Sequence, residues 1–274
     1  LIGLHAAAIA DAVLWTLGTA TGLAVAVVVP FRLIASGGGQ LKLEAVQGSW
    51  LMPVVPPMVS AATGAALIAH LPTGQAQLTL LLACYALFGL SLLASLFVIA
   101  LLCARLAFHG AGPAPLVPTL FMVLGPLGQS VTAVNLLGAA ARGVTPYAPA
   151  LRAFGVLYGV PVIGFALLWL ALAAALTLKA RPPFSLAWWS FTFPVGTVVT
   201  GTSELARHTQ ASAFAYLAVA LYACLLLAWL TVFPRTLKLA STSCRRSPTR
   251  SPATISPRSS PLSRPAISTP PPTR

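Results

Sequence analysis

Long apolar stretches make up most of the chain, and short connections carrying Arg, Lys, Gly and Pro separate them. Seven of these stretches are about 20 residues or longer, the length that a helix needs to cross roughly 30 Å of hydrocarbon. They predict membrane helices over residues 6–30, 50–70, 77–105, 115–141, 150–178, 184–205 and 211–235. A β-barrel would instead show short segments of alternating polarity. The pattern therefore predicts an all-α integral membrane protein.

The predicted helices are of two kinds, which alternate along the chain. The first, third, fifth and seventh are rich in Leu, Ala and Val, whereas the second, fourth and sixth carry Pro, Gly and hydroxyl side chains. Proline removes a backbone hydrogen bond, and in a membrane this is tolerated only where protein or a water-filled cavity covers the freed carbonyls. We therefore expect helical hairpins, each with one inner helix at a central pore and one outer helix facing lipid.

The run Trp-Trp-Ser-Phe-Thr-Phe-Pro-Val-Gly at 188–196 is the most informative segment of the sixth helix. It holds two helix disruptors, Pro194 and Gly196, inside an apolar stretch. A kink is expected there, with an aromatic ring beside it. A bulky ring at a bend in an inner helix could plug a pore.

Neutral donors on the three inner helices suit an anion, which must enter a pore without binding too tightly. Rings of acidic residues, which favour cations, are absent from these stretches. The alternative role for the same residues is packing between helices. The residues predicted to line the pore are Pro53, Pro57, Ser60, Gly64, Gly125, Pro126, Gly128, Gln129, Ser130, Thr132, Thr192, Pro194, Gly196, Thr197 and Thr200.

Ionisable residues are scarce within the predicted helices, where each would cost about 2.5–3.5 kcal/mol or more at the bilayer centre. Asp11 lies near the outer end of the first helix, and Glu204, Arg207 and His208 lie at the outer end of the sixth, at spacings that permit local pairing. We expect these to be solvated interfacial groups rather than a pore mouth. The sequence has no HExxH, nucleophile elbow or phosphate loop, so we expect no enzyme activity, no cofactor and no bound metal.

Composition agrees with a membrane protein: 58% of residues are hydrophobic and 7% charged, against about 25% charged in soluble domains. The formal net charge is +13, but six of the 16 basic residues follow Ser241. The membrane part is thus only mildly basic, and no nucleic-acid partner is expected. We divide the chain into a membrane domain, 1–240, and a Ser/Pro/Arg-rich tail, 241–274, that cannot bury enough apolar surface to fold.

The distribution of Lys and Arg predicts the orientation of the helices, since cytoplasmic loops are richer in these residues. One side has three basic residues and the other has seven before the tail is counted. The three are Arg142, Arg152 and Arg207, and the seven are Arg32, Lys42, Arg105, Lys179, Arg181, Arg235 and Lys238. The C-terminus is therefore expected in the cytoplasm, and the N-terminal end of this chain outside.

Three motifs resemble the tellurite-resistance/dicarboxylate transporter family. They are Trp-Trp-Ser-Phe-Thr-Phe-Pro at 188–194, Gly-Pro-Leu-Gly-Gln-Ser at 125–130 and Trp-Leu-Met-Pro-Val-Val-Pro-Pro at 50–57. The family includes bacterial TehA-type channel homologues, plant slow-type anion channels, yeast malate transporters and fungal sulfite exporters. The resemblance covers about residues 6–240.

The resemblance implies a fold of ten helices in five hairpins around a central pore, lined by the odd-numbered helices. The last helix of this chain would be the tenth, so the chain would run from the fourth helix, with the first three preceding it. Its second, fourth and sixth helices then become the fifth, seventh and ninth. These are the three that the Pro and Gly pattern predicts as inner.

The family's pore is closed by a phenylalanine of the ninth helix, which the Thr-Phe-Pro match places at Phe193, with Phe191 as the second choice. The resemblance further implies a homotrimer in the plasma membrane, with one pore in each subunit. The implied substrates are small anions: C4-dicarboxylates such as malate, sulfite, chloride, nitrate or tellurite-related oxyanions. The alternative expectation, from the helix count alone, is a seven-helix receptor or scaffold without transport activity.

Overall fold

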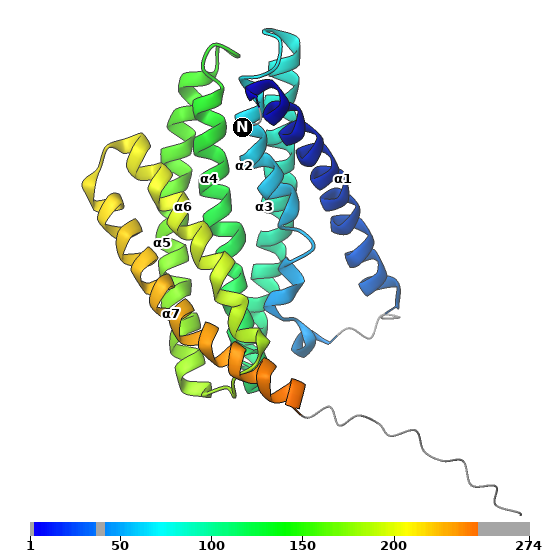
Figure 1. The fold of residues 1–274 in the computed structure, drawn as a ribbon, viewed down its shortest axis with the longest axis vertical. Helices are drawn as coiled ribbons and strands as arrows, with labels where there is room; N and C mark the ends of the chain where they lie inside the picture. The colour runs from blue at the N-terminus through cyan, green and yellow to red at the C-terminus, as the bar shows by residue number, and fades with distance from the viewer. Residues whose placement is uncertain (1–2, 37–41, 246–274) are drawn as a thin grey trace, which may run out of the picture. The chain divides into compact units, whose positions relative to one another are not determined.

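The computed structural model describes residues 3–36 and 42–245, and every regular element among them is helical. The described residues form seven α-helices, as the sequence predicts: α1 (Leu4–Ser36), α2 (Pro56–Ile68), α3 (Gln75–His109), α4 (Leu124–Ala140), α5 (Ala148–Ala180), α6 (Thr192–Thr209) and α7 (Ser212–Arg245). In Figure 1 the helices are labelled, and their colours follow their order in the chain.

The residues up to Thr236 form one compact unit, and those from Leu237 onward form a second. Of the second unit the structure describes only the end of α7. This helix continues to Arg245, five residues into the segment expected to be an unfolded tail. Residues 246–274, the rest of that tail, lie outside the described residues.

Short 3₁₀-helices precede the three helices that were expected to be inner. They are η2 (Gly48–Leu51) before α2, η3 (Ala114–Val123) before α4 and η4 (Leu186–Phe191) before α6; a further one, η1 (Leu43–Ala45), follows α1. Each predicted inner span is thus divided into a 3₁₀ part and an α-helical part. As a result α2 has only 13 residues, about 20 Å at 1.5 Å per residue.

In the three helices expected to be inner, prolines lie where the α-helix begins, whereas α1, α5 and α7 each have a proline in their interior. Pro56 and Pro57 start α2, Pro126 is the third residue of α4, and Pro194 is the third residue of α6. In the first turn a backbone N–H has no partner inside the helix, so proline breaks no hydrogen bond there. The expected kink inside the sixth helix is therefore corrected: Pro194 stands at a junction between a 3₁₀-helix and an α-helix.

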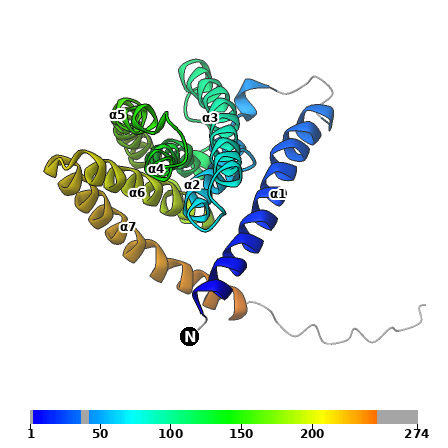
Figure 2. The same ribbon diagram turned by 90° about the horizontal axis from the view of Figure 1, so that it is seen from above.

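Burial separates the two kinds of helix. Within the stretch Ala114–Ala140, which contains α4, 83% of the residues in an apolar 18-residue segment are buried. In the corresponding segments of α1 and α7 only 6% and 11% are buried. Viewed from above, α4 lies among α2, α3, α5 and α6, and it packs against all four (Figure 2). The helices rich in Leu and Ala are the exposed ones, as a lipid-facing surface requires.

Within residues 3–36 and 42–245, five helical segments are long and apolar enough to cross a membrane, judged by length and composition. They are Ala6–Ser36, Gln75–His109, Ala114–Ala140, Ala148–Ala180 and Ser212–Leu239. Together with the two shorter helices α2 and α6 packed among them, they make this a multi-pass membrane protein.

Candidate functional site

A cavity of about 580 Å³ lies between α1, the start of α2, the start of α4 and the junction of η4 with α6. Every residue that lines it is uncharged. The lining residues are Leu14, Trp15, Gly18, Leu51, Met52, Val55, Pro56, Val59, Ser60, Thr63, Met122, Gly125, Trp189, Ser190, Phe193 and Pro194.

Phe193 lies in this cavity with 53% of its surface exposed, unusually open for a ring on an inner helix. Its helix holds it there because Pro194 and Val195, the next two residues, are buried against neighbouring helices. By contrast Phe191, the second choice, is 8% exposed and packs edge-on against Phe121 with ring centroids 6.5 Å apart. Of the two phenylalanines, only Phe193 can move without disturbing the core.

Four of the residues singled out in the sequence line the cavity: Ser60, Gly125, Phe193 and Pro194. The structure also adds two tryptophans that were not among the predicted lining residues, although Trp189 belongs to the run at 188–196. The indole of Trp15 donates a 2.8 Å hydrogen bond to the carbonyl of Ser60, and that of Trp189 donates to Thr236 Oγ1 at 3.0 Å. Trp15 sits in a plain Leu/Ala helix, so nothing in its local pattern pointed to a cavity.

The other twelve predicted lining residues do not border this cavity, and their role in a conduit stays a prediction. They are Pro53, Pro57, Gly64, Pro126, Gly128, Gln129, Ser130, Thr132, Thr192, Gly196, Thr197 and Thr200. Several of them serve close packing in this structure. A Cβ on Gly64 would meet Cys84 Sγ and the Trp15 indole, and one on Gly128 would meet the backbone of Thr197 and Val198.

The hydroxyls on α4 and α6 are tied to nearby backbone or to each other. The Thr197 hydroxyl has one hydrogen to donate, and the carbonyls of Pro194, Leu124 and Gly125 lie within its reach, at 2.7, 3.2 and 3.2 Å. Ser130 accepts a 2.8 Å hydrogen bond from the Tyr158 hydroxyl. These contacts join α4 to α6 and α5, which is the packing role that small hydroxyl side chains often have in membranes.

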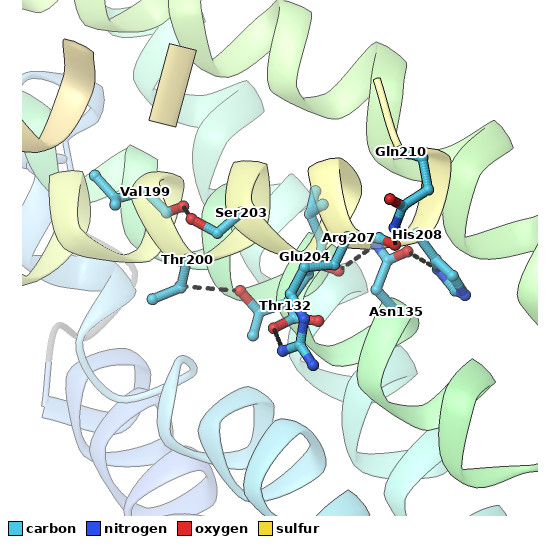
Figure 3. Close-up of polar contacts among 10 residues, drawn as sticks. Thr132, Asn135, Val199, Thr200, Ser203, Glu204, Arg207, His208 and Gln210 are labelled. Atoms are coloured by element: carbon cyan, nitrogen blue, oxygen red, sulfur yellow. Dashed lines mark hydrogen bonds and ion pairs between the residues drawn. The ribbon is translucent and has the colours of Figure 1, made fainter. Parts of the chain in front are cut away.

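One hydroxyl pair bridges α4 and α6 directly. The Oγ1 atoms of Thr132 and Thr200 are 3.0 Å apart, and Thr200 is exposed (Figure 3). Each hydroxyl also has a backbone acceptor on its own helix, Gly128 for Thr132 and Thr197 for Thr200. The two hydroxyls have two hydrogens for three contacts, namely the contact between them and one backbone carbonyl each. Either hydroxyl can therefore rotate toward another acceptor at little cost in free energy.

The predicted local pairing at the end of α6 is confirmed. Arg207 Nη1 lies 3.0 Å from Glu204 Oε1, with the Arg207 side chain 76% exposed and the Glu204 side chain 20% exposed. The same region contains a contact that the sequence analysis missed: His208 touches Asn135 of α4 and Arg152 of α5. These partners lie 73 and 56 residues away along the chain, so no local spacing could reveal them.

The model of the voltage-dependent anion channel family matches residues 2–237, nearly all of the chain ahead of the tail. The chain belongs to this family. The resemblance drawn from the sequence motifs is thereby confirmed.

Relatives that match the chain are 25–29% identical to it. The sulfite efflux pump of Trichophyton rubrum is 29% identical over 231 residues, 81% of this chain and 61% of the relative. That of Arthroderma benhamiae is 28% identical with the same coverage. An uncharacterized transporter of Methanocaldococcus jannaschii is 27% identical over 222 residues, 79% of this chain and 61% of the relative. The chain thus spans about three fifths of the length of these relatives, and no solved structure gives a significant match.

Proposed function

We propose that the protein moves small anions across a membrane through a narrow, uncharged path that Phe193 closes. The observation that carries this proposal is the position of Phe193, a half-exposed ring in a cavity without a charged lining, at the start of an inner helix. A path without fixed charge neither repels an anion strongly nor traps it. The permeant ion is proposed to be negatively charged because the chain belongs to an anion channel family.

Sulfite is the first substrate to test, because two relatives bear the name of sulfite efflux pumps. Chloride, nitrate and C4-dicarboxylates such as malate are the other candidates. The hydroxyls of Ser60 and Thr63 in the cavity wall and the adjustable pair Thr132–Thr200 are neutral donors suited to an oxyanion.

We propose that the C-terminus lies in the cytoplasm, because basic residues are distributed seven to three between the two sides. The plasma membrane, which the family resemblance implies, is the proposed location. A homotrimer is the proposed assembly. Membership of a transport family favours transport over the alternative of a seven-helix receptor or scaffold.

The test is reconstitution of the full-length protein in liposomes, with sulfite, chloride, nitrate and malate as the permeant anion in turn. Anion-dependent flux above that of protein-free liposomes is expected, with no flux of potassium. Equal permeation by cations and anions would overturn the proposed selectivity. Absence of flux, with insertion verified by protease protection of the tail, would overturn the transport role.

A further inference from the structure

Asn135, His208 and Arg152 join three helices at the end of α6 that is remote from Phe193 (Figure 3 shows Asn135 and His208). Asn135 lies in α4 and is only 2% exposed. Its Nδ2 donates to the carbonyl of Val131 at 2.8 Å and to that of Gly155, in α5, at 3.4 Å. Because both of these partners are acceptors, the amide nitrogen must face them and Oδ1 must face His208.

These contacts determine which nitrogen of His208 carries the proton. Asn135 Oδ1 accepts only, and it lies 2.5 Å from Nδ1, so Nδ1 must donate. On the other side of the ring, Nε2 lies 3.1 Å from Nε of Arg152. Arginine donates and cannot accept, so Nε2 must offer its lone pair. The ring is therefore neutral, with its one proton on Nδ1.

The charged groups around His208 oppose a second proton. Burial of the ring and the Arg152 guanidinium both lower the pKa of His208, and only Glu204 acts in the other direction. Glu204 is itself paired with Arg207 on the same helix. The neighbour on α4 is the neutral Asn135, and the one on α5 is the cation Arg152. His208 lies beyond the predicted membrane span 184–205.

We propose that His208 is a proton-operated clasp: the neutral ring ties the end of α6 to α4 and α5, and protonation releases Arg152 and loosens this junction. Protonated Nε2 would carry an N–H that points at the N–H of Arg152, so the hydrogen bond would be replaced by a contact between two cations. The link from Nδ1 to Asn135 would remain, because Nδ1 keeps its proton. The junction would therefore open on the α5 side.

This clasp holds the helix that carries Phe193, which lies 15 residues earlier, or about 22 Å along α6. Control of anion flux by the clasp rests on the proposed function, whereas the clasp itself does not. The test should therefore measure how firmly α5 and α6 are held at this contact, and not transport.

The experiment is hydrogen–deuterium exchange of the full-length protein in lipid nanodiscs at about pH 7.5 and about pH 5, on either side of the usual histidine range. Protection factors, corrected for intrinsic exchange at each pH, are followed for segments 148–155 and 203–210. We expect them to fall several-fold on acidification in the wild type. Segment 56–68 of α2, which contains no titratable side chain, is the internal control and should not change.

Two variants assign the effect to His208. In His208→Gln, the amide can donate to Asn135 and accept from Arg152 without taking up a proton, so protection should be the same at both pH values. In Arg152→Gln, no second cation opposes a protonated ring, so the loss of protection on acidification should be largely abolished. A fall in His208→Gln equal to that of the wild type would overturn the proposal, as would a wild type that does not respond. Neither result depends on whether the protein transports anions.

Discussion

The ring of Phe193 faces Gly125, where α6 begins beside α4, across a space that one methyl group would fill: a Cβ added to Gly125 would stand 3.7 Å from Cε1 of Phe193. This would be ordinary van der Waals contact, so the missing side chain of Gly125 leaves a gap beside the ring that a methyl group would fill. The ring is also 53% exposed. Phe193 therefore has room to move, as the gate that we propose at this residue requires.

Replacing the ring should open the path. We expect Phe193→Ala to raise anion flux several-fold in liposomes, because it removes the bulk from the cavity without uncovering a buried contact. The matched control is Phe191→Leu, which alters the buried ring two residues away and should lower stability without raising flux. Unchanged flux in Phe193→Ala, with normal insertion, would remove this residue from the gate.

The size of a side chain introduced at Gly125 should affect the gate that we propose at Phe193. Gly125→Ala should leave flux and stability nearly unchanged, since its Cβ would meet Phe193 and Pro194 at 3.7–4.0 Å. Gly125→Leu should push the ring from its resting position and change the flux measured at equal protein density. Identical flux in the wild type and Gly125→Leu would contradict this effect of side-chain size.

Gly128 should tolerate no side chain at all. A Cβ there would collide with the backbone of Thr197 and Val198 on α6, and backbone cannot turn aside as a side chain can. Gly128→Ala should therefore force α4 and α6 apart and lower the free energy of unfolding by about 1–3 kcal/mol or more. The measurement is the thermal unfolding temperature in detergent, which should fall. Gly164→Ala in α5, which has nothing within 4 Å of the added Cβ, is the matched control and should be neutral or slightly stabilising. Equal unfolding temperatures for the two variants would contradict the packing argument.

Arg105 should be a structural cation that cannot be replaced by lysine. It is 4% exposed at the end of α3, and its guanidinium donates to the carbonyls of Val46, at 2.7 Å, and Ala111. A lysine has one nitrogen and cannot reach both carbonyls in this forked geometry. Each carbonyl left without a donor costs about 1–3 kcal/mol.

Thermal unfolding of Arg105→Lys and Arg105→Gln measures this role. Both should melt well below the wild type, and limited proteolysis should cut the segment 42–52 more readily. Arg32→Gln is the matched control, since Arg32 has the same charge and is exposed. A loss of stability in Arg32→Gln as large as in Arg105→Gln would point to net charge and not to the two carbonyls.

The number of helices and their division into inner and outer kinds could be read from the sequence, because both depend on local composition. Leu- and Ala-rich stretches became the exposed helices α1, α3, α5 and α7, and the stretches with Pro, Gly and Thr became the packed ones. The Glu204–Arg207 pair was predictable for the same reason: residues three apart on a helix are neighbours whatever surrounds them.

The direction in which each side chain points was decided only by the tertiary structure, since it depends on how each helix is rotated against its neighbours. The predicted conduit residues share the inner helices, yet Gly128 packs against α6 while Gly125 borders the cavity three residues earlier. Prolines of the packed helices proved to lie in the first turns of α2, α4 and α6, where the backbone needs no N–H donor. The contacts of His208 with Asn135 and Arg152 join segments that are distant in the chain, and only the packing of α4, α5 and α6 brings them together.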